Sequence, residues 1–269
     1  MNKKIYVLLI LIGIITFIIM SCNDTKTTSD LLCQDSKLIY NIIEYKYCDS
    51  YTTEGEFYDE ISGYDKGYYI TYPQIENLTN KELETLINEK MNDIAMSRIF
   101  DNMSPERDNV KTTYTITLST DKYFSVRFIL SSFVEHQAYP NVSIKTFTID
   151  LQTGEILTLK DIIHINESFK SSFFNIFKNV KNDYEFINDT EYSHFEETIN
   201  EYIGGLIDYE LLLTCDDESN VDVHSCITAD SLIICFSVPH SSGSYALYAA
   251  KFSELIDWLI LGKTKIIIK

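Results

Sequence analysis

The chain has 269 residues, of which 45% are hydrophobic and 13% aromatic, and its formal net charge is -18 at pH 7. This abundance of large apolar residues excludes a largely disordered chain. The acidic balance, with no basic patch, argues against binding to nucleic acid or to anionic lipid headgroups, whereas a cationic partner would be attracted. The length suffices for one large domain or two small ones.

The first residues have the pattern of an export signal. A basic start precedes an almost wholly apolar run, Ile5–Met20, and Ser21 and Cys22 end it. Such a run before a small residue is typical of a secretory signal peptide. The letters "IMSC" resemble the lipobox of bacterial lipoproteins, in which the cysteine is acylated and becomes the new N-terminus. We therefore predict a lipoprotein signal peptide over residues 1–21 and a bilayer anchor on Cys22. An uncleaved apolar anchor is the alternative, although the run is slightly short to span a bilayer.

Cleavage would change the charge and define the mature chain. It would remove Lys3 and Lys4 but no acidic residue, so the net charge would become -20. Residues 22–36 are then predicted to be a lipidated polar tether. The predicted location is the extracytoplasmic side of the cell envelope, on an inner or an outer membrane.

Five further cysteines follow the predicted lipidation site. Because the envelope permits disulfides, we predict the pairs Cys33–Cys48 and Cys215–Cys226, each closing a short polar loop. Cys235 lies in the apolar run "LIICFSV" and is predicted to be a buried thiol. The cysteines and histidines lack the spacing of metal ligands, so we predict neither a metal nor another cofactor.

The first half of the mature chain predicts strands around one helix. Residues 37–72 are rich in tyrosine and are predicted to form short strands and turns. A helix is predicted over about 79–100, with Thr79 and Glu82 as a capping box. Its predicted apolar stripe consists of Leu83, Leu86, Ile87, Met91, Ile94, Ala95 and Ile99. Alternating residues then predict an antiparallel meander, in which Thr153-Gly154 forms a hairpin turn.

The second half predicts two helices followed by strands. One helical face consists of Phe169, Phe173, Ile176, Phe177 and Val180, and another of Tyr192, Phe195, Ile199, Ile203 and Leu206. Strands are predicted over residues 231–238 and 245–252, and a short helix near 254–261. The predicted fold class is α+β, with antiparallel sheets, packed helices and two subdomains, residues 37–160 and 161–269.

Three segments carry a family resemblance: "YPQIENLTNKELETLINEKMND", "SSFVEHQAYPNVSIKTFTIDLQTGEILTLKDII" and "DSLIICFSVPHSSGSYALYAAKFSEL". Together they resemble an envelope domain family of unknown activity. That family occurs in the extracellular part of the lysozyme-sensing anti-sigma factor and beside the catalytic domain of a peptidoglycan deacetylase. The resemblance covers roughly residues 65–262. It implies an exported or anchored α+β fold with two subdomains and no catalytic residues of its own, and the anti-sigma factor binds lysozyme through this domain.

Two loops depart from the family pattern. Residues 137–140 read "QAYP" where the family usually has Gly-Ala-His-Pro, and "PHSSG" at 239–243 replaces a Tyr…Gly stretch. If these loops bind a ligand, that ligand differs from the family's. The predicted ligand-binding residues are Tyr139, His240, Ser241 and Ser242. An ordinary turn at 240–242 is the plainer alternative, because a serine that is activated by histidine needs groups from distant segments.

The remaining motifs give little support for catalysis. The sequence contains no G-x-S-x-G, H-E-x-x-H or P-loop motif. The acidic stretch 216–222 lacks the spacing of a calcium loop and is predicted to be a solvated hairpin tip. The favoured function is a membrane-anchored, non-enzymatic binding or sensing module. The sequence does not identify its ligand, for which a cationic protein such as lysozyme and a cell-wall glycan are the two candidates. A cell-wall hydrolase and a purely structural lipoprotein remain as alternatives.

Overall fold

The computed structural model describes residues 39–49, 66–100, 102–180, 200–204, 212, 215–216 and 223–260. All of them belong to one compact unit, Leu38–Lys269. The predicted signal peptide, the tether with Cys22, and Cys33 lie outside the described residues. Within the described ranges, no helix is both long enough and apolar enough to cross a membrane.

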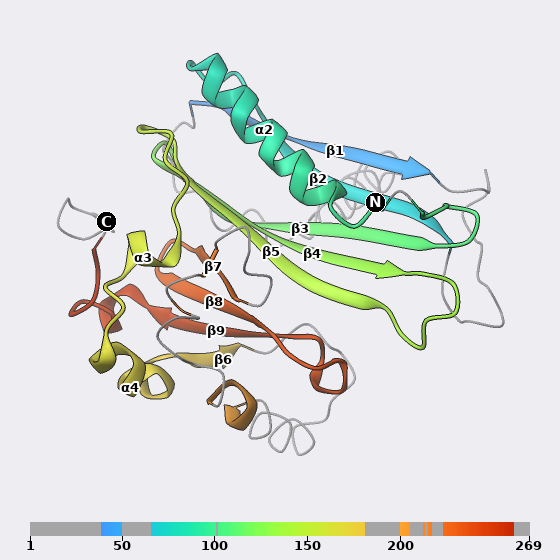
Figure 1. Cartoon of the computed structure of the whole chain (residues 1–269). Coiled ribbons are helices and arrows are strands. Elements are labelled where there is room, and N and C mark those ends of the chain that lie inside the picture. The colour runs from blue at the N-terminus through green and yellow to red at the C-terminus, as the bar shows by residue number, and fades with distance from the viewer. Residues whose placement is uncertain are drawn as a thin grey trace, which may run out of the picture. The chain divides into compact units, whose positions relative to one another are not determined.

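The first sheet has five strands in the order β1-β2-β3-β4-β5 (Figure 1). The strands are β1 (Asn41–Asp49), β2 (Gly67–Glu76), β3 (Asn109–Ser119), β4 (Tyr123–Phe133) and β5 (Asn141–Asp150). All neighbours pair antiparallel except β2 and β3, which are parallel. A parallel pair needs a crossover connection, and the helix α2 (Lys81–Met96) lies within it. The β3–β5 meander is as predicted, but its parallel junction with β2 was not.

The helix α2 covers one face of this sheet. Its N-cap is Asn80, whose side chain accepts the Leu83 N–H at 3.1 Å, and not the predicted Thr79. The partner carboxylate is Glu84, which accepts the Leu78 N–H at 2.7 Å, and not Glu82. The helix ends at Met96 rather than near residue 100. The buried side chains of its stripe are Leu83, Ile87, Met91 and Ala95, whereas the predicted member Leu86 is 45% exposed.

The second sheet has four antiparallel strands in the order β6-β9-β8-β7. They are β6 (Lys178–Val180), β7 (Val223–Ile227), β8 (Ser231–Ser237) and β9 (Tyr245–Lys251). Two helices, α3 (Leu159–Ile162) and α4 (Glu167–Ile176), precede β6. The predicted helical residue Val180 lies in β6, and a 3-10 turn (Phe252–Glu254) replaces the helix that was predicted near 254–261. Of the predicted helix around 192–206, the structure describes residues 200–204, which are helical.

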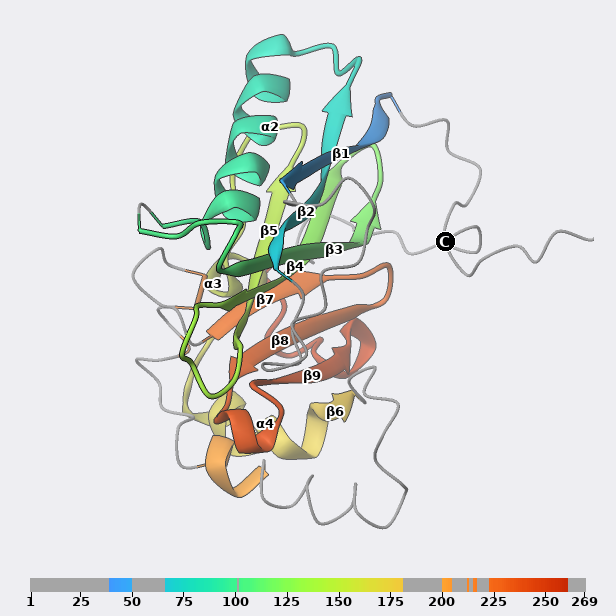
Figure 2. The ribbon, with the colours of Figure 1, turned by 90° about the vertical axis from the view of Figure 1, so that its right-hand side faces the viewer.

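The two sheets face each other and carry their helices on the outside (Figures 1 and 2). Along β4, Phe124, Val126 and Phe128 pack in the core beneath α2. The alternate residue Ile129 packs instead with Cys235 and other residues of the second sheet. On the far side of the second sheet, Phe173 of α4 contacts the rings of Phe236 and Tyr248. This helix–sheet–sheet–helix arrangement confirms the predicted α+β class, and the subdomain boundary at residue 160 stays a prediction.

No disulfide is seen among the described cysteines. Pairing of β7 with β8 places Cys226 opposite Ile233, one diagonal step from Cys235, and the two thiols interact. A hydrogen bond with Cys226, together with burial, raises the pKa of Cys235. The predicted pair Cys215–Cys226 is not seen, and the strand register places Cys226 near Cys235 instead. Cys48 is an exposed thiol on β1, so the pair with Cys33 is not seen either. The buried thiol at Cys235 is confirmed.

Candidate functional site

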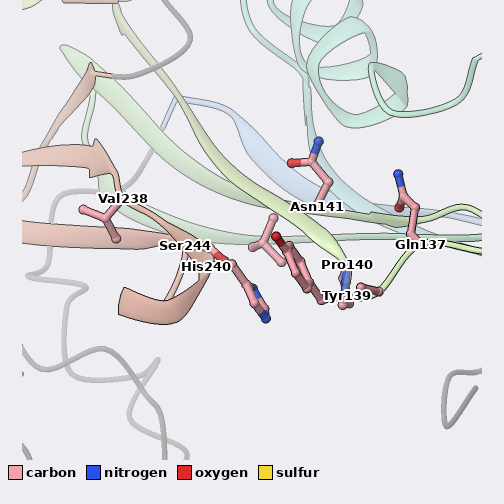
Figure 3. A pocket seen from close by; sticks show the side chains of 9 residues that line it. Gln137, Tyr139, Pro140, Asn141, Val238, His240 and Ser244 are labelled. Carbon is pink, nitrogen blue, oxygen red and sulfur yellow. The ribbon is translucent and has the colours of Figure 1, made fainter.

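The loop between β4 and β5 meets the loop between β8 and β9, and an aromatic pair marks the contact. The rings of Tyr139 and His240 stack with their centroids 4.2 Å apart and an interplanar angle of 3° (Figure 3). These loops are far apart in the sequence and belong to different sheets. The fold therefore brings together two of the predicted ligand-binding residues, and ligand binding itself stays a prediction.

A pocket of about 430 Å³ lies around the stacked pair. It is lined by Gln137, Ala138, Tyr139, Pro140, Asn141, Val142, Val238, His240 and Ser244. The volume falls within the range of about 300–1,000 Å³ that is usual for small-molecule sites. Ser241 and Ser242, which were also predicted, are not among the lining residues. Ser244 is a lining residue, although it was not among the predicted ligand-binding residues.

The β8–β9 loop has a tightly bonded backbone. The Ser242 N–H donates to Pro239 O at 2.8 Å, and the Val238 N–H donates to Ser244 O at 3.0 Å. Gly243 has a φ of +93°, a left-handed conformation in which glycine carries no steric cost, and Ser244 follows at +70°. This turn places Ser244 Oγ 3.2 Å from His240 Nδ1, so the serine orients the imidazole ring.

The β4–β5 loop is fastened at both ends of its turn. The Gln137 N–H donates to Val134 O at 3.0 Å, and Gln137 Oε1 accepts the Val134 N–H at 3.1 Å. The next N–H along the chain, that of Glu135, donates to Asp108 Oδ1 at 3.0 Å. The loop that carries Tyr139 is thus tied to a carboxylate at the start of β3.

Asp108 is fully buried, yet its charge is well compensated. Its Oδ2 accepts the Ser104 N–H at 2.9 Å and an Arg107 guanidinium N–H at 3.0 Å. Burial alone would raise the pKa of Asp108, but Arg107 and the N–H donors of Ser104 and Glu135 outweigh it and hold that pKa below its usual range. Asp108 is therefore a charged anchor of the β4–β5 loop.

A second carboxylate, Asp216, joins the two sheets. Its side chain is 9% exposed and accepts hydrogen bonds from Thr146 Oγ1 at 3.1 Å, the Leu159 N–H at 3.1 Å and the Ser225 N–H at 2.6 Å. These donors come from β5, α3 and β7. The prediction of a solvated tip is wrong for Asp216, whereas residues 217–222 lie outside the described residues. Burial raises the pKa of Asp216 despite its hydrogen bonds, since every one of those donors is neutral.

The neighbouring His224 is also buried. Its Nδ1 lies 3.9 Å from Asp216 Oδ1. Burial nevertheless dominates, assisted by the positive charge of Lys145, and lowers the pKa of His224 to about 3. Among the described residues, its Nε2 has no hydrogen-bond partner. The imidazole is therefore neutral at physiological pH. The described ranges contain no cluster of three or more histidine, cysteine or acidic side chains that is arranged to hold a metal ion.

A second cavity of about 510 Å³ has a different, charged lining. It is lined by Lys122, Tyr123, Asp150, Glu155, Ile156, Leu157, Lys160, Asp161 and Ile260. Lys122 Nζ lies 3.9 Å from Asp150 Oδ2, and Asp161 Oδ2 accepts the Thr158 N–H at 2.9 Å. The predicted turn beside this cavity is confirmed at Gly154, whose φ is +77°. Because several of these charges are already engaged, the pocket at Tyr139 is the stronger candidate for a ligand site.

Comparisons with known proteins give a likeness of fold without an activity. No protein-family model matches the chain, and no curated protein matches it. One similar solved structure is a DUF3298 family protein from Pseudomonas aeruginosa PAO1, with 12% identity, a TM-score of 0.44, and 84% of this chain and 95% of that chain covered. Another is a DUF3298 family member from Bacteroides fragilis NCTC 9343, with 10% identity, a TM-score of 0.41, and coverage of 83% and 94%.

Proposed function

We propose that the chain is a lipid-anchored protein of the bacterial cell envelope, whose folded part is a non-enzymatic binding module. The observation that carries the proposal is the pocket built around the stacked rings of Tyr139 and His240. The lipobox-like sequence at Cys22 supports an anchor on the extracytoplasmic side of an inner or outer membrane. The ligand docks where the β4–β5 and β8–β9 loops meet.

Two classes of ligand are compatible with the chain. Its net charge of -18 would steer a cationic protein, such as a lysozyme, toward its surface. The exposed aromatic ring of Tyr139 offers a platform for a cell-wall glycan. Either ligand would make the protein a sensor or receptor in the cell envelope.

A cell-wall hydrolase is the alternative, and the contact between His240 and Ser244 is its support. Nucleophilic catalysis also needs an accessible hydroxyl and a group that orients the base. Ser244 is only 7% exposed, and the pocket lining includes no carboxylate. The arrangement therefore favours binding over hydrolysis. Release of soluble fragments from peptidoglycan by the purified protein would contradict the non-enzymatic proposal.

The binding function can be tested by calorimetry on residues 23–269, which include the whole compact unit. We expect saturable binding to hen-type lysozyme or to soluble peptidoglycan fragments at physiological salt, and loss of that binding in Tyr139→Ala. Tyr69→Ala is a matched control, because Tyr69 is 40% exposed on β2 and lies outside the pocket lining. The absence of a binding signal with both ligands would refute the proposed binding function.

The anchor can be tested separately by fractionating cells that express the full chain. We expect the protein to remain in the membrane fraction through a high-salt wash and to incorporate labelled palmitate. Cys22→Ala should abolish the incorporation of palmitate, because this cysteine carries the acyl chains. Unchanged palmitate incorporation in that variant would contradict acylation at Cys22.

A further inference from the structure

The pocket around Tyr139 lacks fixed charge although the chain as a whole is strongly acidic. None of its nine lining residues is an aspartate, glutamate, lysine or arginine. Its polar side chains are the amides of Gln137 and Asn141, the hydroxyls of Tyr139 and Ser244 and the imidazole of His240. Amides and hydroxyls both donate and accept hydrogen bonds, which suits a neutral ligand that carries hydroxyl or acetamido groups. A lysine or arginine from a cationic protein would find no carboxylate in this pocket.

The second cavity shows what a site for ions would contain. Five of its nine lining residues are charged, and both signs are present. It also holds an ion pair between Lys122 and Asp150, whose closest nitrogen and oxygen atoms are 3.9 Å apart. The difference between the two cavities is one of chemistry rather than size, since their volumes are about 430 and about 510 Å³. The uncharged lining around Tyr139 is therefore a local property of that site.

The stacked pair leaves much of Tyr139 exposed. His240 covers one face of the Tyr139 ring in a nearly parallel contact, yet 53% of Tyr139 is exposed (Figure 3). The exposed part of the Tyr139 ring is thus an apolar surface beside polar groups. A pyranose ring has matching properties, because one face presents C–H groups while its rim carries hydroxyls.

The loops also hold this surface in place before any ligand arrives. The bond from the Glu135 N–H to Asp108 and the two bonds between Val134 and Gln137 fix the turn that carries Tyr139. On the other side, Ser244 orients His240. A preorganised platform costs less conformational entropy on binding, which matters for a ligand that makes few contacts.

We propose that this pocket binds an uncharged sugar ring of a glycan, which packs on the exposed aromatic ring of Tyr139. Gln137 and Asn141 contact its hydroxyl or acetamido groups. This inference rests on the proposed binding function and deepens it, because it selects a neutral carbohydrate over a cationic protein as the occupant of the site.

The test is a titration of residues 23–269 with the uncharged trisaccharide of N-acetylglucosamine, at low and at physiological salt. We expect saturable binding whose affinity hardly changes with salt, since no ion pair is made. Tyr139→Ala should weaken binding by about tenfold or more, and Tyr139→Phe, which keeps the ring face, should restore most of the affinity. Tyr69→Ala serves as the control and should bind as the unaltered chain does.

The outcomes separate this inference from the function on which it rests. If lysozyme binds and the trisaccharide does not, the inference is overturned while the binding function stands. Sugar binding that survives Tyr139→Ala would place the sugar elsewhere and would also overturn the inference. If lysozyme, peptidoglycan fragments and the trisaccharide all fail to bind, both the inference and the proposed function are wrong.

Discussion

Asp108 and Asp216 are two aspartates with similar surroundings and opposite behaviour. Both side chains are largely or fully buried, and both accept several hydrogen bonds. The pKa of Asp108 lies below its usual range, whereas that of Asp216 lies above it. The difference is Arg107, which supplies a full positive charge to Asp108, while the donors to Asp216 are neutral. A nearby positive charge, more than the number of hydrogen bonds, decides whether a buried carboxyl group is ionised.

The two aspartates also serve different regions of the molecule. Asp108 fastens the β4–β5 loop, which carries Tyr139 and belongs to the candidate site. Asp216 fastens β5, α3 and β7 to one another and so holds the two sheets together. Loss of the first should therefore affect the site, and loss of the second should affect the whole fold.

The largest effect is expected from Asp216→Ala. The variant leaves the buried N–H groups of Leu159 and Ser225 without acceptors, so the free energy of unfolding should fall by about 3–5 kcal/mol. Chemical denaturation measures this loss. Asp121→Ala removes an exposed aspartate and should change stability by less than about 0.5 kcal/mol. A loss below about 1 kcal/mol in Asp216→Ala would mean that this carboxylate does not hold the sheets together.

The next effect concerns His224, which stays neutral beside Asp216. Its pKa is about 3 in the folded chain and about 6.5 when unfolded, so only the unfolded state takes up a proton as the pH falls through this window. Through this group, the free energy of unfolding should fall by about 3 kcal/mol between pH 7 and pH 4. Denaturation curves across that range measure the loss, and His224→Gln should lack it. Equal acid sensitivity in the variant would contradict a buried neutral imidazole.

Asp216 titrates in the opposite sense and provides an internal check. Because burial raises its pKa, the folded state holds a proton that the unfolded state has lost. Its contribution to stability is complete below the ordinary aspartate pKa and is lost as the pH rises through its folded pKa. The acid profile of the unaltered chain is therefore the difference of two effects, and only comparison with His224→Gln isolates the histidine.

A smaller loss is expected from Asp108→Asn. Arg107 is 43% exposed and can recover water contacts, so stability at pH 7 should fall by about 1–3 kcal/mol. Since the pKa of Asp108 is depressed, its contribution is present above the ordinary aspartate pKa and disappears as the pH falls through the folded pKa. The free energies of unfolding of the variant and of the unaltered chain should therefore become equal in acid, as paired denaturation curves would show. A difference that grows in acid would contradict the ion pair with Arg107.

Local patterns in the sequence were sufficient to predict much of the framework. The alternation of β8 and β9 and the apolar stripe of α2 each depend on neighbouring residues, so the strands and the helix could be predicted with small errors at their ends. The parallel pairing of β2 with β3 could not be predicted. The strands expected before α2 had no defined bounds, so a crossover connection between two of them could not be recognised. The helix that separates two strands is in hindsight the signal of a parallel pair.

The candidate site was predictable only in part. Tyr139 and His240 could be selected because their loops depart from the family pattern, but their stacking depends on how the two sheets face each other. Asp216 was predicted to be exposed because its neighbours in the sequence are acidic. Its hydrogen-bond donors Thr146 and Leu159 are distant along the chain and could not be recognised from that stretch. The register that places Cys226 near Cys235 could not be predicted for the same reason, since loop length says nothing about strand register.

Apart from the control Asp121→Ala, the smallest change in stability is expected from Tyr139→Ala, and this variant tests whether the site and the framework are separable. Tyr139 is 53% exposed, and its stacking with His240 contributes about 0.5–1 kcal/mol at most. The free energy of unfolding should therefore change by less than about 1 kcal/mol, as denaturation would measure, while glycan affinity falls by about tenfold. Asp216→Ala should show the reverse at temperatures where it remains folded, with a large loss of stability and nearly unchanged affinity. If Tyr139→Ala destabilises the chain as much as Asp216→Ala does, Tyr139 belongs to the core of the fold, and any loss of binding would follow from unfolding.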